Sequence, residues 1–397
     1  MERVFLSDTV RPELSNIRDE LYEFRRDLHR YPELSGKEVL TSAKIKEKLE
    51  LYGYDVRIIG GTGLYTELKG GKEGHVIMLR ADIDALPIEE KSSYPYPSKH
   101  KGIMHACGHD VHASALLGAA KYLALHKGEL SGSVRFVFQN AEEQGHGSKY
   151  FLEENVTDGV MRIYGFHVSP HIGLGRMLIT EGADLASCDS MRIRLYGKSS
   201  HIAKPHLGND TSVCAADIVM HLRALAGGSN PLEPALIGIG KVSSGTAWNI
   251  ISDYGEIEGT VRTFSVEQRN ILIRSVEEVI SKVSALYGVR AETEFELNAT
   301  CLVNDAGACE TAYKAAAATV GEGNVTRKHT PFSFTSDDFS EFSKDVPGCF
   351  IHLGTAVEDR EDTKVSLHSP DLYIPDEAVM TGCELLIRCA LEHLEIK

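Results

Sequence analysis

Long hydrophobic runs, an excess of basic charge and closely paired cysteines are all missing from this sequence. No apolar stretch reaches the roughly 18 residues of a transmembrane helix, and the N-terminal segment lacks the apolar centre of a signal peptide. Its 57 Asp and Glu residues outnumber 42 Lys and Arg, giving a net charge of −15. We therefore expect neither nucleic acid nor a membrane as a partner.

The eight cysteines are scattered and form no C-x-x-C pair. In a long chain with a normal apolar content, this favours buried thiols in a reducing cytoplasm over a disulfide framework. We therefore predict a cytoplasmic protein. Cys107 alone lies among other potential metal ligands, in the stretch "MHACGHDVHASALL".

The arrangement of apolar residues predicts two domains. The chain of 397 residues is too long for one ordinary core. Toward both ends, strands that are apolar on both faces alternate with helices, which is typical of a covered parallel sheet. Residues 186–298 instead show half-buried strands and helices in the βαββαβ order of ferredoxin-like domains. We predict a mostly parallel α/β catalytic domain (1–185 and 299–397) with an inserted ferredoxin-like domain (186–298).

Potential metal ligands stand at the ends of several predicted strands. Asp82 and Asp84 follow one strand, Glu142 and Glu143 follow another, and His167 ends a third. Since ligands bind at the carboxyl ends of parallel strands, we expect these side chains to meet at one rim of the sheet.

Cys107 and His109 lie in the loop before a predicted helix, and His368 precedes the last helix. Gly108 permits the sharp bend that two ligands on one cluster need. Imidazole and carboxylate ligands suit Zn²⁺, Mn²⁺ or Co²⁺, and the thiolate favours softer ions. The sequence therefore predicts a transition-metal site.

The remaining polar residues of this loop have simpler expected roles. We expect Asp110 to be the N-cap of the helix, and His105 and His112 to support the site. The alternative to a metal site is a cysteine amidase, in which Cys107 is the nucleophile and His109 or His167 the base.

Several stretches resemble one known family. "MHACGHDVHASALLGAA", "FQNAEEQGHG", "YGFHVSP" and "SLHSPDLYIPDEA" are similar to the M20 metallopeptidase/amidohydrolase family. The subgroup is that of N-acyl-amino-acid amidohydrolases, hippurate hydrolases, auxin-conjugate hydrolases and N-acetyldiaminopimelate deacetylases. "FRRDLHRYPELSGKE", "LRADIDALP", "HIAKPHLGND" and "GTAWNIISDYGEIEGTVRT" extend the resemblance over nearly the whole chain.

The resemblance implies a dinuclear centre and roles for named residues. The implied ligands of two divalent ions (Zn, Mn or Co) are Cys107, His109, Glu143, His167 and His368. It also implies Glu142 as general base, Asp82 and Asp84 as supporting residues, His201 as a donor to the reaction's oxyanion, and Asn249 and Arg262 as substrate-binding residues. The inserted domain is implied to be a lid and dimerisation domain, so a homodimer or higher homo-oligomer is expected.

The expected function is metal-dependent cleavage of the amide bond of N-acyl-L-amino acids, with a metal-bridged water activated by Glu142. The expected substrate is a small N-acylated amino acid or a short peptide. A dipeptidase or carboxypeptidase of the same family is an alternative, and a non-catalytic binding protein on this scaffold is a third. The sequence leaves the acyl group and the amino acid open.

Overall fold

The computed structural model describes residues 6–228, 230 and 233–395, which form two compact units. The first unit is formed within Met1–Gly182, Val303–Thr330 and Asp338–Lys397, and the second within Ala183–Leu302 and Pro331–Asp337. The sequence-based boundaries place the segment Pro331–Asp337 in the catalytic domain, whereas in the structure it joins the second unit.

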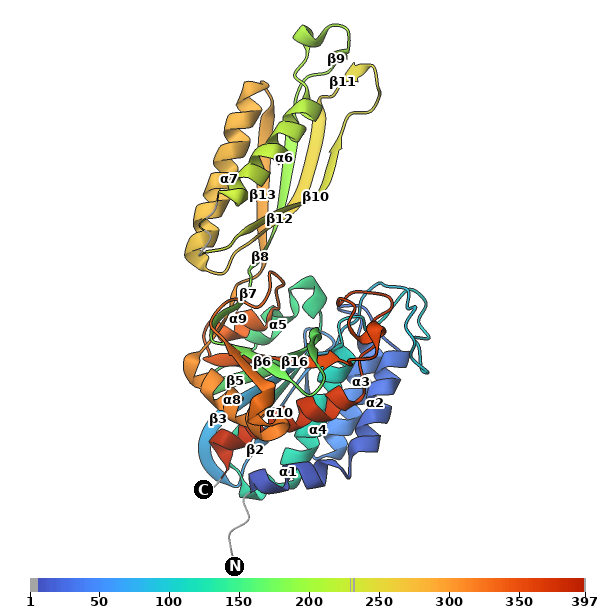
Figure 1. The fold of residues 1–397 in the computed structure, drawn as a ribbon, viewed down its shortest axis with the longest axis vertical. Coiled ribbons are helices and arrows are strands. Elements are labelled where there is room, and N and C mark those ends of the chain that lie inside the picture. Colours follow the sequence, from blue (N-terminus) through green and yellow to red (C-terminus); the bar gives the residue numbers. More distant parts are fainter. Residues whose placement is uncertain (1–5, 229, 231–232, 396–397) are drawn as a thin grey trace, which may run out of the picture. The chain divides into compact units, whose positions relative to one another are not determined.

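An eight-stranded sheet forms the centre of the first unit (Figure 1), with strand order β1-β2-β4-β3-β5-β16-β6-β15. The four central strands β4, β3, β5 and β16 run parallel, whereas β2 and β6 are antiparallel to their neighbours β4 and β16. This confirms the prediction of a large, mostly parallel sheet. The strands are β1 (Arg57–Ile59), β2 (Gly63–Lys69), β3 (Lys72–Asp82), β4 (Ser131–Gln139), β5 (Val160–Gly173), β6 (Met177–Thr180), β15 (Val325–Lys328) and β16 (Gly348–Ala356).

The helices of the first unit pack on this sheet and on one another. α4 is buried along almost its whole length, because it packs against α2 and α10 as well as against the sheet. A helix buried in this way is apolar all round, as the run "ASALLGAA" is. The helices are α1 (Leu6–Leu14), α2 (Arg18–Arg30), α3 (Val39–Leu51), α4 (His109–Leu125), α5 (Gly147–Glu153), α8 (Ala306–Val320), α9 (Phe339–Ser343) and α10 (Glu377–Leu394).

The second unit is a four-stranded antiparallel sheet with two helices, and its strand order is β10-β12-β8-β13. Met191, Ile193 and Leu195 alternate along β8 and share a buried apolar cluster with residues of both helices. The elements are β8 (Cys188–Tyr196), α6 (Thr211–Gly227), β10 (Leu236–Ser244), β12 (Tyr254–Arg262), α7 (Val266–Leu286) and β13 (Arg290–Ala299). Two small ribbons pair β9 (Ser200–His201) with β11 (Ile250–Ile251) and β7 (Gly182–Leu185) with β14 (Leu302–Asn304).

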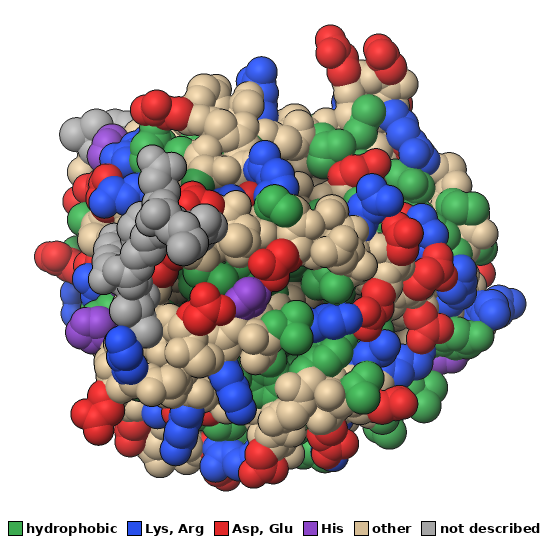
Figure 2. Space-filling model, turned by 90° about the horizontal axis from the view of Figure 1, so that it is seen from below, with side chains coloured by type: hydrophobic (Ala, Val, Ile, Leu, Met, Phe, Trp, Pro, Cys, Tyr) green, Lys and Arg blue, Asp and Glu red, His purple; other side chains and the backbone are tan. Residues whose placement is uncertain are grey.

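The charged side chains on the face shown in Figure 2 are interspersed, and neither sign gathers into a patch there. Among the described residues, no helix combines the length and the apolar character that crossing a membrane requires.

Candidate metal centre

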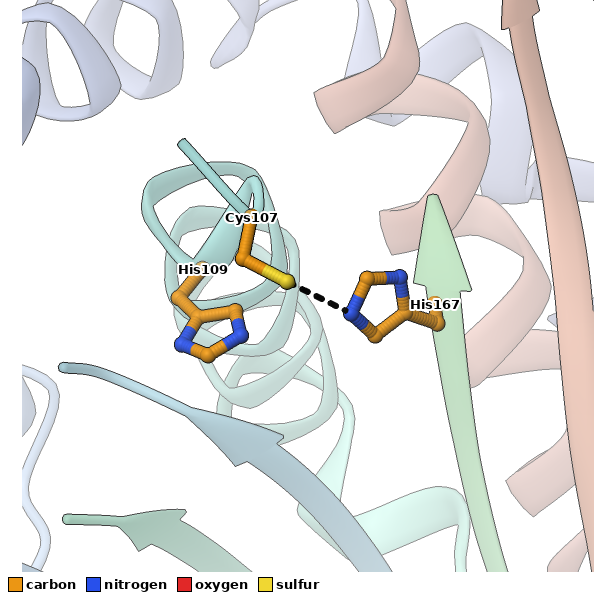
Figure 3. A group of neighbouring side chains, drawn as sticks. All are labelled: Cys107, His109 and His167. Atoms are coloured by element: carbon orange, nitrogen blue, oxygen red, sulfur yellow. Dashed lines mark hydrogen bonds between the residues drawn. The ribbon is translucent and has the colours of Figure 1, made fainter. Parts of the chain in front are cut away.

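Cys107, His109 and His167 lie close together at one rim of the large sheet (Figure 3). His109 is the first residue of α4, Cys107 lies in the loop just before it, and His167 comes from β5. The Sγ atom of Cys107 lies 3.4 Å from Nε2 of His167, and the ligand atoms of all three residues lie within 4.8 Å of one another. Because β5 stops pairing with β3 at Gly165, His167 stands beyond the paired part of those two strands.

Glu143 and His368 complete a second group with Cys107. Nε2 of His368 lies 3.5 Å from Oε1 of Glu143, and Nε2 of His109 lies 3.8 Å from the same oxygen. The ligand atoms of Cys107, Glu143 and His368 are within 4.8 Å of one another. The structure therefore brings the five expected ligands into two overlapping groups that share the thiol.

The bend between Cys107 and His109 requires glycine. Gly108 has φ +86°, in the left-handed region that residues with a β-carbon avoid. A β-carbon there would lie 2.5 Å from Cγ2 of Val168 and 2.8 Å from Cδ1 of Ile374. Glycine thus allows both the turn and its close packing, which point the thiol and the imidazole at one cluster.

Asp84 fixes two of the candidate ligands at once. Its Oδ1 accepts a hydrogen bond from Nδ1 of His109 at 3.1 Å, which leaves Nε2 of that ring facing the cluster. Its Oδ2 accepts from the backbone N–H of Glu143 at 3.0 Å and from the hydroxyl of Ser35 at 2.7 Å. A carboxylate behind a ligating imidazole sets its tautomer and orientation.

Two buried atoms of the cluster fit a bound cation. Nε2 of His109 and Oε1 of Glu143 are buried and have no hydrogen-bond partner among the described residues. Leaving such polar atoms unsatisfied is costly, and a metal ion between them would remove that cost. The donor set of thiolate, imidazole and carboxylate suits a transition ion.

The electrostatics of the cluster do not suit a cysteine nucleophile. Burial raises the pKa of the Cys107 thiol well above its ordinary value, and the carboxylates of Glu143 and Glu142 raise it further. Burial also lowers the pKa of His167 well below its ordinary value, so no imidazolium pairs with the thiol there. A catalytic cysteine needs the opposite, a lowered thiol pKa, so the groups around Cys107 do not activate it as a nucleophile.

His109 is expected to exchange a proton for a metal ion. Burial lowers its pKa, but the carboxylates of Asp82, Asp84 and Glu143 outweigh that effect and raise the pKa to about 10. At neutral pH the ring therefore carries a second proton, which metal binding must displace.

Both ring nitrogens of His112 are engaged in hydrogen bonds. Its Nδ1 donates to Oδ1 of Asp82 at 2.6 Å, and its Nε2 accepts from the backbone N–H of Val168 at 3.1 Å. Val168 follows His167 directly, so His112 and Asp82 support the strand that carries this candidate ligand. Asp82 in turn accepts from Nη1 of Arg80 at 2.7 Å.

The prediction that Asp110 caps the helix is wrong. α4 begins at His109 with Gly108 at the N-cap position, and no side chain makes a cap hydrogen bond there. Instead the buried Asp110 carboxylate accepts from Nε of Arg25 at 2.8 Å and from Nδ1 of His29 at 2.9 Å. The carboxylate of Asp110 therefore binds side chains that are distant in sequence and not the backbone N–H groups of its own helix.

His105 was expected to support the site, but it makes no hydrogen bond to a described residue. Both of its ring nitrogens are buried without a partner in the part of the chain that the structure describes. Burial lowers its pKa to about 4, so the ring is neutral at physiological pH.

Glu142 enters the site through a tight turn after β4. Ala141 has φ +53° and ψ +36°, and a short 3-10 turn spans Glu142–Gln144. This turn brings the ligand atoms of His109, Glu142 and Glu143 within 4.8 Å of one another. Sequence reasoning missed Ser35 and Glu38, which hydrogen-bond to Asp84 and to Ala141. The signal that could have identified them is the stretch "ELSGKE", which is part of the sequence that resembles the family.

The three remaining expected residues lie in the second unit. His201 is exposed on β9, and its Nδ1 accepts from the N–H of Ala203 at 3.1 Å, so a neutral ring carries its proton on Nε2. Asn249 accepts through its backbone carbonyl from the N–H of Ile202 at 3.0 Å. Arg262 ends β12 and donates through Nη1 to the carbonyl of Phe334 at 3.0 Å.

The comparisons with known proteins show that the chain belongs to a family of hydrolases. Residues 78–392 match Peptidase family M20/M25/M40, and the chain belongs to this family. This confirms the resemblance found in the sequence and the expectation of a metal-dependent hydrolase.

Two curated relatives and one solved structure illustrate the similarity. The chain is 36% identical over 388 residues to N-acetyl-L-cysteine deacetylase of Bacillus subtilis (strain 168), covering 96% of this chain and 90% of the relative. It is 33% identical over 385 residues to thermostable carboxypeptidase 1 of Saccharolobus solfataricus, and the match covers 95% of this chain and 96% of the relative. A Bacillus subtilis crystal structure described as a dinuclear metal-binding peptidase from the M20 family is 34% identical, with a TM-score of 0.82 and coverage of 95% and 98%.

Removing the charge of Asp84 should weaken metal binding. In Asp84→Asn, an amide replaces the carboxylate that accepts from His109 and from the N–H of Glu143, so the affinity for Zn²⁺ should fall about 10- to 100-fold. Competition with a chromophoric chelator measures this affinity. The matched control is Asp55→Asn at an exposed position. An unchanged affinity in Asp84→Asn would contradict its role in fixing the ligands.

Proposed function

We propose that the protein is an amidohydrolase that cleaves N-acyl-L-amino acids with the help of two divalent ions, Zn²⁺, Mn²⁺ or Co²⁺. The observation that carries the proposal is the turn after β4, which brings the carboxylates of two adjacent glutamates, Glu142 and Glu143, within 4.8 Å of the ligand atom of His109. The deacetylase relative supports the substrate class, because its name describes removal of an acyl group from an amino acid. The proposed ligands are Cys107, His109, Glu143, His167 and His368.

In this proposal the carboxylate of Glu142 performs the proton transfers. Divalent ions, when bound, supply Lewis-acid activation of water and of the amide carbonyl. Glu142 takes a proton from the attacking water and returns it to the leaving amine. His201 donates from Nε2 to the developing oxyanion. Arg262 holds the substrate carboxylate through guanidinium nitrogens other than Nη1, and Asn249 assists it.

A carboxypeptidase activity is the second candidate, because one relative carries that name at 33% identity. Both reactions hydrolyse an amide next to a free carboxylate, and they differ in the group on the acyl side. A panel of N-acetyl, N-benzoyl and longer N-acyl amino acids is compared with N-blocked dipeptides, each with Mn²⁺, Zn²⁺ and Co²⁺. Released amine is the readout. Faster release from acyl amino acids is expected, whereas preference for peptides would select the second candidate.

Chelation should abolish activity and lower thermal stability. Metal bound only by the folded state adds about 4 kcal/mol of stability when its concentration is 1,000 times its Kd. EDTA should therefore reduce both amine release and the melting temperature, and added Mn²⁺, Co²⁺ or Zn²⁺ should restore both. Differential scanning fluorimetry and the amine assay measure the two effects on one sample. Full activity in EDTA would contradict a metal-dependent reaction.

His201→Ala should lower kcat without changing the metal content. Loss of one donor to an oxyanion typically costs about 10²–10³-fold in rate. We also propose that the second unit acts as a lid and dimerisation domain, so that His201 serves the partner's site. Mixed dimers of His201→Ala and Glu142→Gln should then recover activity. Wild-type kcat in His201→Ala would reject its role, and absence of recovery in mixed dimers would assign it to its own subunit.

A further inference from the structure

We propose that Glu38 is a positioning residue whose buried carboxylate holds Ala141 in the left-handed conformation and so directs Glu142 and Glu143 to their separate tasks. The inference rests on the proposed function, because it takes Glu142 as the base. Glu38 precedes α3 and lies far from Glu142 in sequence.

Glu38 is fully buried and accepts three hydrogen bonds from neutral donors. Its Oε1 accepts from the backbone N–H groups of Gly36 at 2.8 Å and of Ala141 at 2.9 Å. Its Oε2 accepts from the hydroxyl of Thr62 at 2.6 Å. Burying a carboxylate is costly, and here burial raises the pKa of Glu38. A charged acceptor binds an N–H more strongly than a neutral one, which explains why a carboxylate is useful at this position.

The N–H that Glu38 binds belongs to a residue in an unfavourable conformation. Ala141 has φ +53°, which residues with a β-carbon rarely adopt because Cβ approaches the neighbouring carbonyl oxygen. The carbonyl of Ala141 accepts from the N–H of Gly147 at 3.2 Å, so both sides of the residue are bonded. Strained residues of this kind persist where their surroundings hold them.

The conformation of Ala141 matters because two adjacent residues must reach one site. Along a continuing strand, the side chains of Glu142 and Glu143 would point to opposite faces of the sheet. The turn at Ala141 ends the extended path of β4 and brings both carboxylates within 4.8 Å of the His109 ligand atom. The same turn places the N–H of Glu143 on Asp84.

The segment that carries Glu38 is also tied to the other side of the cluster. The hydroxyl of Ser35 donates to Oδ2 of Asp84 at 2.7 Å, and the N–H of Ala85 donates to the carbonyl of Glu33 at 2.8 Å. Residues 33–38 therefore connect the end of β3 to the turn after β4. These contacts fix the backbone around Glu38, so its carboxylate has a defined position from which to bind the N–H of Ala141.

The test is a double-mutant cycle between Glu38→Leu and Ala141→Gly, assayed at saturating metal. Glu38→Leu removes the acceptor, and kcat should fall about tenfold as the turn leaves its left-handed conformation, with KM within about twofold. Glycine adopts that conformation freely, so the double variant should recover most of the lost kcat. A residue that matters only for stability would show no such recovery. The matched control is Glu33→Gln, whose carboxylate accepts from the backbone N–H groups of Leu40 and Thr41 at the start of α3.

Two results would overturn the inference. One is a wild-type kcat in Glu38→Leu. The other is a double variant that has the same melting temperature as Glu38→Leu and recovers none of its lost kcat. If Glu38→Leu fails to fold, Glu38→Asp keeps the charge but shortens its reach, and the same recovery is expected. Glu142→Gln, assayed in parallel, separates the two proposals. If Glu142→Gln is active, Glu142 is not the general base and the proposed function is wrong. If Glu142→Gln is inactive but Glu38→Leu is fully active, only the positioning role of Glu38 is wrong.

Discussion

Glu142→Gln is expected to bind metal normally and to lose about 10²–10⁴-fold in kcat, the usual contribution of a general acid or base. The amide has nearly the shape of the carboxylate but cannot take a proton from water. Because Glu143 and not Glu142 is the proposed ligand, metal content should stay at the wild-type value. Amine release and elemental analysis of the same preparation measure the two quantities.

The neighbouring glutamate provides the sharpest control. Glu143→Gln should lower metal content, since its Oε1 faces both His109 and His368. Glu154→Gln, at an exposed position after α5, should change neither quantity. Equal loss of metal in Glu142→Gln and Glu143→Gln would contradict the division of roles, as would appreciable turnover in Glu142→Gln.

Arg25→Leu is expected to destabilise the protein by about 3–5 kcal/mol, the range for breaking a buried ion pair. Arg25 is fully buried and donates to the carboxylates of Asp110 at 2.8 Å and Asp376 at 2.7 Å. It also donates to the hydroxyls of Tyr94 at 2.7 Å and Tyr96 at 2.8 Å. Leucine would leave the carboxylate of Asp110, in the first turn of α4, buried without the Arg25 guanidinium. Urea unfolding at pH 7 measures the loss.

The effect of Arg25→Leu should depend on pH in a definite direction. Burial raises the pKa of Asp110, but Arg25 and His29 outweigh burial and hold that pKa well below its ordinary value. A depressed carboxyl pKa stabilises the fold above the unfolded pKa of about 3.9, and this stabilisation is lost as pH falls below it. The difference in the free energy of unfolding between the wild type and Arg25→Leu should therefore become smaller below about pH 4. Arg18→Leu, at an exposed pair with Asp19, is the matched control.

The sequence predicted those parts of the fold that leave a local pattern. Strands β3, β4, β5 and β16 are apolar on both faces, and that pattern indicates a covered parallel sheet. The carboxyl ends of parallel strands meet at one rim of the sheet. This explains why Glu143, which follows one predicted strand, and His167, which ends another, both lie near Cys107. Strand β2, which lies between the edge strand β1 and β4, went unpredicted, because buried and half-buried residues mix along it and give a weak signal.

Contacts between distant segments could not be predicted in this way. Asp110 has the position and chemistry of an N-cap, and only the fold reveals that Arg25 and His29 compete for it. The bond from Glu38 to Ala141 likewise joins segments with no common periodicity. His167 was placed at a strand end, whereas β5 continues to Gly173. Local propensity gives the elements, but long-range polar contacts are decided by tertiary structure.

The position of His368 has a consequence for biosynthesis. This residue has φ +64°, and its N–H donates to the carbonyl of Ala106 at 2.8 Å, next to Cys107. His368 is thus the last of the five candidate ligands to leave the ribosome, long after Cys107, His109, Glu143 and His167. A nascent chain that ends before His368 lacks this ligand and the backbone bond that seats it. The proposed metal site, and the stability that a bound ion would add, therefore requires synthesis to proceed past His368.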